Sequence, residues 1–115
     1  GQIADIVKPI DGEPVITKAF PNSFVQTDLE AQLKKVGCNK LVLAGFMTHM
    51  CVNSTAHGAF NLGFEVTVVA SATATRSLQA DQGKTLSAKA VHEGALASTR
   101  DLYAAVVDTV DDLPV

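Results

Sequence analysis

The chain has 115 residues and a formal net charge of −3, and 47% of its residues are hydrophobic. This length allows one domain with its own core, and the apolar fraction excludes an intrinsically disordered chain. The scattered lysines and arginines exclude the basic patch of a nucleic-acid-binding protein, and no apolar run is long enough to span a membrane. Because the two cysteines form neither a CxxC pair nor a disulfide framework, we expect a cytoplasmic protein without a structural metal or a cofactor.

Proline and glycine residues mark turns throughout residues 1–14, so this lead-in is predicted to be irregular. Residues 15–17 predict a short strand that brings Lys18 to its carboxyl end, followed by a loop broken by Pro21. A lysine at the end of a strand is most often a solvated charge. The carboxyl ends of parallel strands are, however, where α/β proteins keep their sites, and Lys18 therefore stays a candidate.

A capping box, in which Thr27 is followed three residues later by Glu30, predicts the start of a helix. Glu30 and Lys34 are spaced for an ion pair on the solvent side of this helix, and Gly37 is expected to end it. Cys38 then falls in the following turn, where we expect a structural or inert thiol. The apolar face of the helix is formed by Leu29, Leu33 and Val36.

The central stretch, residues 40–63, reads KLVLAGFMTHMCVNSTAHGAFNLG. The apolar run at 41–44 predicts a strand that is buried on both faces of a parallel sheet. A helix that ends at Gly63 is predicted by the spacing of Val52, Ala56, Ala59 and Phe60. Cys51 lies at the entrance of this helix, where unpaired backbone N–H groups and the helix dipole stabilise a thiolate, and this favours a nucleophile. A buried structural cysteine remains an equally good interpretation of the pattern.

Residues 64–70 predict a valine-rich strand, and residues 71–76 form the loop beyond it. A helix is predicted from about 85 to 99, with His92 on its apolar face, where a hydrogen-bonded core histidine is a better interpretation than a ligand. Residues 104–107 predict the last strand. The alternation of strands and helices indicates an α/β fold, a doubly wound (Rossmann-like) parallel sheet flanked by helices.

Two histidines close to Cys51 could serve as its base in a Cys–His pair. His49 precedes the cysteine by two residues, and His57 lies off the apolar stripe of the same predicted helix. Each is better explained as a residue of the surface or the pocket rim. The loop GFMTHMC lacks the GxGxxG and GxxxxGK patterns, which disfavours dinucleotide and P-loop binding.

Residues 41–76 resemble the core of the isochorismatase-like cysteine hydrolases, in which a strand, a G-x-x-T-x-x-C-V turn, a helix and a G-[FY]-x-V segment follow one another. The stretch ITKAFPNSFVQTDLEAQL is similar to a second signature of the family, a lysine followed by S-x-F-x-x-T-x-L. Both signatures stand in the family's order, and the resemblance covers residues 15–107. Within the core signature, the matching residues are Gly45, Thr48, Cys51, Val52, Thr55, Ala59, Gly63, Phe64 and Val66.

The resemblance implies that Cys51 is the nucleophile and Lys18 the active-site lysine. It also implies an oxyanion hole made by the backbone amides of Met47 and Cys51, next to a cis peptide bond between Phe46 and Met47. The thiolate would attack an amide-type carbon of a small-molecule substrate, ammonia or an amine would leave, and water would hydrolyse the thioester. Relatives with isochorismatase activity proper lack this cysteine, so its presence favours the amidase-like branch. Residues expected around the pocket are Phe24, Phe46, Thr48 and His49.

Two features depart from the family pattern. The family's catalytic aspartate follows a first strand well before the lysine, and neither Asp5 nor Asp11 fits that position; Ser71 stands where an aspartate is common. We therefore expect residues 1–115 to be one isochorismatase-like domain that lacks its N-terminal segment. In a family sheet of order 3-2-1-4-5-6 the chain would supply strands 3, 4, 5 and 6, and either that segment or a homo-oligomer would fill the gap. The alternative is a non-catalytic α/β fragment or assembly subunit with a redox-sensitive thiol.

Overall fold

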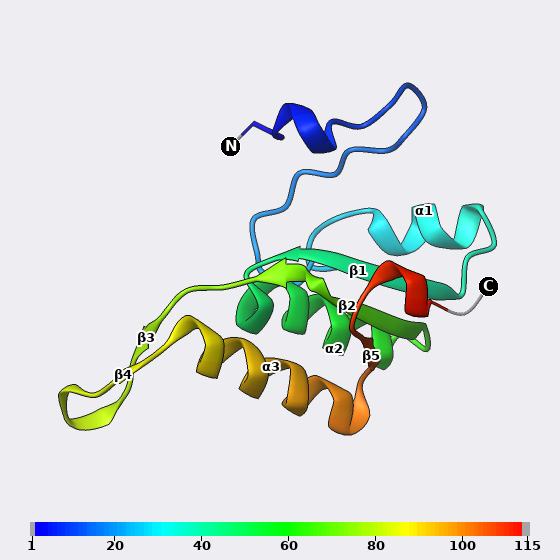
Figure 1. Cartoon of the computed structure of the whole chain (residues 1–115). Helices are drawn as coiled ribbons and strands as arrows, with labels where there is room; N and C mark the ends of the chain where they lie inside the picture. The colour runs from blue at the N-terminus through cyan, green and yellow to red at the C-terminus, as the bar shows by residue number, and fades with distance from the viewer. Residues whose placement is uncertain (1, 114–115) are drawn as a thin grey trace.

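The computed structural model describes residues 2–113, and its centre is a sheet of three parallel strands in the order β1-β2-β5. These strands are β1 (Lys40–Phe46), β2 (Glu65–Ala74) and β5 (Ala105–Val107). Helix α2 (Asn53–Asn61) connects β1 to β2, and α3 (Ala88–Leu102) precedes β5. The shorter helix α1 (Leu29–Lys35) lies on the opposite side of the sheet from α3 (Figure 1). The predicted α/β fold with a parallel sheet flanked by helices is confirmed.

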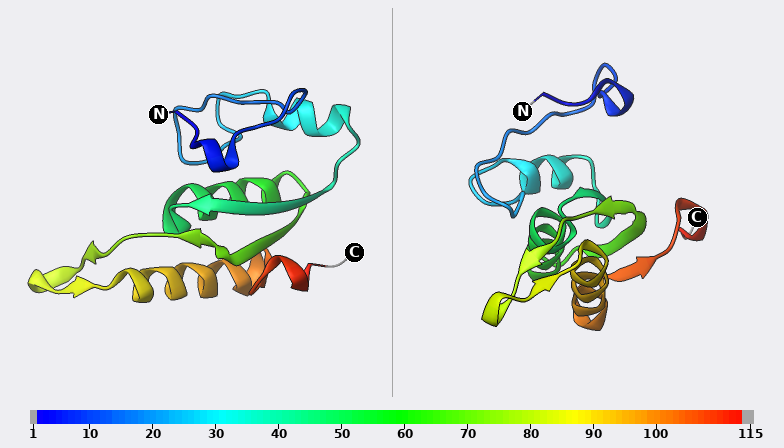
Figure 2. Two further views of the ribbon diagram at one scale, coloured as in Figure 1. Left: turned by 45° about the horizontal axis from the view of Figure 1, so that its top comes forward. Right: turned by 60° about the vertical axis from the view of Figure 1, so that its left-hand side comes forward.

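The remaining elements are short. Strands β3 (Leu78–Gln79) and β4 (Thr85–Leu86) form an antiparallel hairpin that projects beyond the start of α3 (Figure 1). In the right-hand view of Figure 2, the N-terminal arm lies beyond α1, on the far side from α3. Single turns of 3-10 helix occur at Asp5–Val7, Asp81–Gly83 and Val110–Asp112.

The strand predicted at residues 15–17 is not formed, and within residues 2–113 the parallel sheet has three strands rather than four. A strand exists only through the hydrogen bonds it exchanges with a neighbour, and residues 15–17 lie in the N-terminal arm, outside the sheet. Lys18 is consequently presented by an arm that no strand ladder holds. The position of its ammonium group depends on other contacts.

Burial along β1 alternates, so the prediction that this strand is buried on both faces was wrong. Leu41 and Leu43 face the core, whereas Val42 is 57% and Phe46 76% exposed. Leu41 and Leu43 pack against the core cluster to which α2 and α3 contribute. β1 is also an edge strand, so its outer backbone N–H and C=O groups are unpaired within the described sheet.

Helix α1 begins without the predicted capping box. Its N-cap is Asp28, which makes no side-chain cap, and Thr27 instead donates its hydroxyl hydrogen to the Ser23 carbonyl at 2.6 Å. The predicted ion pair of Glu30 and Lys34 is present at 2.9 Å. The Thr27 hydroxyl also accepts from the Leu29 N–H at 3.4 Å, so the Thr27 side chain links the preceding loop to the start of the helix.

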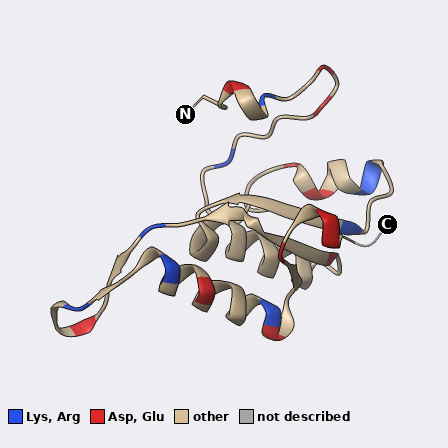
Figure 3. Ribbon diagram, in the orientation of Figure 1, with Lys and Arg blue, Asp and Glu red and all other residues tan. Residues whose placement is uncertain are grey.

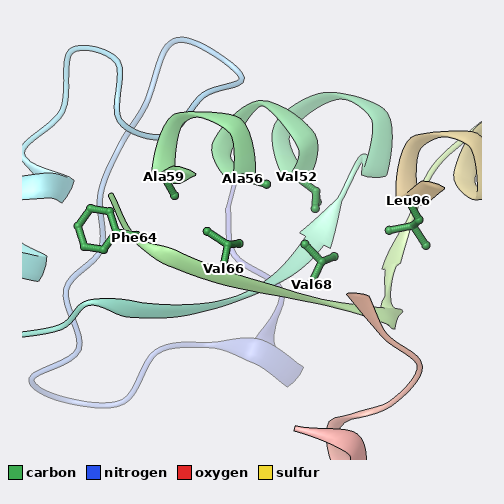
Figure 4. Close-up of a cluster of buried hydrophobic side chains, with 7 residues drawn as sticks. All are labelled: Val52, Ala56, Ala59, Phe64, Val66, Val68 and Leu96. Carbon is green, nitrogen blue, oxygen red and sulfur yellow. The ribbon is translucent and has the colours of Figure 1, made fainter. Parts of the chain in front are cut away.

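The core lies between α2, β2 and α3 (Figure 4). Ala56 and Ala59 are fully buried, and because their side chains are small the helix packs close to the sheet. Phe60, which was expected on the same stripe, is 38% exposed and packs edge-on against Tyr103 with ring centroids 5.4 Å apart. The buried cluster consists of Val52, Ala56, Ala59, Phe64, Val66, Val68 and Leu96.

Helix α3 starts three residues later than predicted, because residues 85–86 pair in the β3–β4 hairpin. Ser87 caps it, its hydroxyl accepting a hydrogen bond from the Ala90 N–H at 3.0 Å. Charged residues lie on α1, on α3, at the starts of β1 and β2 and in the loops, whereas α2 carries no Lys, Arg, Asp or Glu (Figure 3). No helix within residues 2–113 is both long and apolar enough to cross a membrane.

Val68 lies at the centre of the sheet and is fully buried, so its replacement tests the packing of the core. Val68→Ala should lower the free energy of unfolding by about 2 kcal/mol, since it removes buried methyl groups and leaves a cavity. Val42→Ala, the same change at the exposed face of β1, should cost less than about 0.5 kcal/mol. Chemical denaturation of both variants measures the difference, and equal losses would contradict this description of the core.

Candidate active site

The site is built where the chain leaves β1 and enters α2. β1 and β2 pair in register as far as Leu43, after which the register shifts and Gly45, at φ +123°, lies opposite Thr73. This φ belongs to the region that favours glycine. The Phe46–Met47 peptide bond is cis, as the resemblance implies, and a π-helical turn over Thr48–Val52 leads into α2. These features place Cys51 at the helix entrance, as the sequence predicted.

Lys18 meets Cys51 at this entrance. The Lys18 Nζ lies 3.2 Å from the Cys51 Sγ and also donates to the carbonyl oxygens of Phe20 at 3.0 Å and Pro21 at 3.3 Å. An ammonium group has three N–H donors and no acceptor, so these three partners use its full capacity. The sulfur is therefore held as a hydrogen-bond acceptor beside a positive charge.

Cys51 opens into a small cavity of about 170 Å³ between the arm, β1 and α2. A larger cavity of about 780 Å³ lies between the arm and α1, but its lining is mostly apolar and includes no cysteine, serine or threonine. We therefore place the chemistry at the smaller one. Its lining residues are Lys18, Ser23, Leu43, Ala44, Cys51, Val52 and Thr55.

The other residues expected around the pocket lie elsewhere. Thr48 is fully buried and its hydroxyl lies 2.9 Å from the Nδ1 of His92, so it faces α3. Phe24 stacks on Phe64 with ring centroids 5.8 Å apart, beside the core cluster. Phe46 is largely exposed. Neither Thr48, Phe24 nor Phe46 is among the residues that line the Cys51 cavity.

The three histidines all have partners other than Cys51. His49 Nδ1 lies 2.6 Å from the Thr75 hydroxyl, at the end of β2. His92 bonds Thr48, which confirms the prediction of a hydrogen-bonded core histidine. His57 stacks on Tyr103 at 3.8 Å, its Nε2 is buried without a partner, and burial lowers the pKa of its ring. Within residues 2–113 no cluster of His, Cys, Asp and Glu side chains could hold a metal ion.

Helix α3 anchors the turn that carries Cys51. The Asn53 amide donates to the Ala95 carbonyl at 3.2 Å, and the Thr99 hydroxyl donates to the Asn53 Oδ1 at 2.7 Å. Together with the bond between Thr48 and His92, these contacts fix both ends of the turn to one face of α3. The amides of Met47 and Cys51 lie on this anchored segment, so its backbone is held in place without any help from the cavity side.

Sequence reasoning assigned no role to Thr55 and Ser23, although both line the cavity. Thr55 is buried, and its Oγ1 accepts a hydrogen bond from the Ser23 N–H at 3.0 Å. The available signal was the spacing of Thr55, four residues after Cys51, which places both side chains on the same face of a helix.

Comparisons with known proteins agree with this fold. Residues 1–111 match the isochorismatase domain, and the chain belongs to the isochorismatase family. It is 39% identical over 108 residues to the isochorismatase family protein YddQ of Bacillus subtilis, across 94% of this chain and 59% of YddQ.

Solved structures give the same result. An isochorismatase from Pseudomonas putida superposes with a TM-score of 0.92 and 34% identity, across 97% of this chain and 57% of that one. The nicotinamidase of Staphylococcus aureus has a TM-score of 0.66 and 30% identity, across 80% of this chain and 53% of that one. The chain thus spans little more than half the length of the proteins that it matches.

The contact between Lys18 and Cys51 predicts unequal thiol reactivity. At about pH 7, iodoacetamide should label Cys51 about tenfold faster than Cys38, because a neighbouring ammonium group favours the reactive thiolate. Lys18→Met keeps the length of the side chain and should slow the labelling of Cys51 alone. Cys38, whose Sγ donates to the Lys40 carbonyl at 3.0 Å, is the internal control. Faster labelling of Cys38, or equal rates, would contradict the assignment.

Proposed function

We propose that the chain is a cysteine hydrolase that cleaves a C–N bond of an amide-type small molecule through a thioester on Cys51. The observation that carries this proposal is the 3.2 Å contact between Lys18 Nζ and Cys51 Sγ, at the carboxyl end of β1. The carboxyl ends of parallel strands are where α/β proteins bind their ligands. No metal or cofactor takes part in the proposed reaction.

Each residue has one task in this mechanism. The ammonium group of Lys18 stabilises the Cys51 thiolate, which attacks the amide carbon and forms a C–S bond. The backbone amides of Met47 and Cys51 donate hydrogen bonds to the oxyanion of the tetrahedral intermediate. The C–N bond then breaks, its electron pair goes to nitrogen, and the nitrogen leaves as ammonia or an amine after taking up a proton. Water finally attacks the thioester and releases the acid and the thiol.

The family relationship supports amide-type chemistry, since one matched structure is a nicotinamidase. The cavity geometry supports it as well, because the nucleophile, the cation and the backbone amides of the turn all come from the segments that meet at the end of β1. The lining of the described cavity contains no carboxylate or imidazole. A positioned acid that protonates the leaving nitrogen contributes about 10² to 10⁴ in rate, and we propose that it comes from outside these lining residues.

The outer edge of β1 offers a place for the group that supplies this acid. Its backbone groups are unpaired in the described sheet, and Val42 and Phe46 expose apolar surface beside it. Exposed edges of this kind recruit further strands. We propose that an additional segment, or a second copy of the chain, pairs there and completes the site.

Acylation tests the nucleophile separately from amine release. An activated ester needs no acid for its leaving group, so the chain should gain one acyl group on Cys51, detected by intact mass and peptide mapping. Cys38→Ala, the matched control at the other thiol, should be acylated equally, and Cys51→Ala should lose at least about 10³-fold in rate. Undiminished acylation of Cys51→Ala would overturn the proposal. Ammonia release from a panel of amides should rise when the part of YddQ that this chain does not match is added.

A catalytically silent assembly subunit is the second candidate, and the open edge of β1 favours it. Such a subunit would assemble but would show no selective acylation of Cys51, so the same experiment separates the two functions.

Association through the edge of β1 can be measured separately from catalysis. Sedimentation of the chain at increasing concentration should show self-association, or a complex once the additional segment is supplied, because pairing satisfies the open edge. Replacing Val42 by lysine should weaken the association, since edge charges oppose pairing. A monodisperse 12.0 kDa monomer under all these conditions would rule the partner proposal out.

A further inference from the structure

The hydroxyl of Thr55 lies between the helix that carries Cys51 and the loop that carries the partners of Lys18. Thr55 is one helical turn beyond Cys51, and both side chains line the same cavity. Its Oγ1 accepts from the Ser23 N–H at 3.0 Å and lies 3.0 Å from the Ser23 Oγ and 3.4 Å from the Pro21 carbonyl oxygen. One buried hydroxyl therefore contacts three polar groups of the loop.

The Pro21 carbonyl connects this hydroxyl to the ammonium group. It accepts from Lys18 Nζ at 3.3 Å on one side and receives the Thr55 hydroxyl at 3.4 Å on the other. A hydroxyl has one hydrogen and two acceptor lone pairs. If the Ser23 hydroxyl donates to Thr55, the hydrogen of Thr55 is free for Pro21, and every one of these contacts can be made at once.

The loop at residues 20–24 also packs closely against α2. A Cβ at Gly58 would come within 2.6 Å of the Asn22 side-chain amide, so the helix has no room for a side chain there. The same Asn22 accepts from the Phe24 N–H through its Oδ1 at 3.0 Å, which gives the loop its tight shape. Glycine at 58 permits the close approach, and the Thr55 hydroxyl supplies the hydrogen bonds that fix it.

We propose that Thr55 is a positioning residue that fixes the 20–24 loop and, through the Phe20 and Pro21 carbonyls, directs the Lys18 ammonium group at the Cys51 sulfur. A lysine stem is flexible, and holding its ammonium group in one place costs rotamer entropy. The two carbonyls compensate for this cost only when they converge on one point. Their position depends on Thr55, because no strand ladder holds the arm. The proposal rests on the role of Lys18 in the proposed function, and it adds a residue that acts on the sulfur through the lysine.

The test measures the rate at which iodoacetamide labels Cys51 at about pH 7 and at about pH 9. The quantity compared between variants is the rate at the lower pH divided by the rate at the higher pH. A general change of access to the thiol alters both rates equally and leaves this ratio unchanged, whereas a displaced ammonium group lowers the rate at the lower pH selectively. Thr55→Val, which replaces the hydroxyl by a methyl group of similar size, should lower the ratio about threefold to tenfold. Thr55→Ser, which keeps the hydroxyl, should restore it. Thr67→Val, the same change on β2 beside a different cavity, is the matched control and should leave the ratio unchanged.

A double-mutant cycle with Lys18→Met decides whether Thr55 acts through the lysine. Once Lys18 is removed, Thr55→Val should have no further effect on the ratio, because contacting groups that act as one unit are not additive. Additive effects, an unchanged ratio in Thr55→Val, or a failure of Thr55→Ser to restore it would each overturn the proposal. If circular dichroism shows that Thr55→Val does not fold, Thr55→Ala removes the same hydroxyl and takes its place in the cycle.

Failure of this inference is distinguishable from failure of the proposed function, since labelling requires no substrate. A ratio that falls with Lys18→Met but not with Thr55→Val would overturn the role of Thr55 alone. A normal response of both variants, together with no acylation and no amide cleavage, would overturn the hydrolase proposal alone.

Discussion

The contact between the Lys18 ammonium group and the Cys51 sulfur joins two segments that are 33 residues apart in the chain. A hydrogen bond between an ammonium group and a sulfur requires a short distance, so both segments have to be held in place. The cis peptide, the π-helical turn and the entrance of α2 hold the sulfur. The 20–24 loop holds the cation. The site is therefore a junction between a rigid strand-to-helix turn and an arm that has no regular secondary structure of its own.

The two sides of this junction are secured by different means. On the side of α3, side-chain bonds run from Thr48 to His92 and from Asn53 to Ala95 and Thr99, and they surround the buried face of the turn. On the side of the arm, the contacts run mainly to backbone groups of the loop. Backbone partners suit an irregular segment, because its N–H and C=O groups would otherwise be buried without hydrogen bonds. The helix between the two sides carries no charged residue, so Lys18 is the only charged side chain in the lining of the described cavity.

Sequence reasoning located α2, α3, β5 and the valine-rich part of β2, although β2 continues to Ala74, through most of the predicted loop at 71–76. The periodicity of α2 and α3 and the valine-rich run of β2 each contain enough residues to define a buried face. The errors have a common cause, which is that pairing and burial depend on neighbours distant in sequence. Residues 15–17 have strand-like composition but no partner strand, and the apolar run of β1 alternates between core-facing and exposed side chains.

The candidate site shows the same division. The position of Cys51 at a helix entrance made it a candidate nucleophile from the local sequence. Its pairing with Lys18 was predicted only from the resemblance, because no local pattern indicates a contact between residues so far apart in the chain. Thr27 illustrates the opposite problem. It fits a capping box by spacing, yet Asp28 is the N-cap, and the Thr27 hydroxyl donates to the Ser23 carbonyl while accepting from the Leu29 N–H. The partners of Thr55 could not be predicted from a local pattern either, because they are backbone groups of a loop that is distant in sequence.

The small side chains of Ala56 and Ala59 limit how such a site can change by substitution. They set the distance between α2 and the sheet, and both are fully buried, so any larger side chain there would lift the helix and carry Cys51 away from the end of β1. The packing between α2 and the sheet therefore leaves no room for larger side chains. Changes in which ligands the cavity accepts must therefore arise on its open side, where the arm lies and the edge of β1 is uncovered. Substitutions there can alter specificity without altering the chemistry.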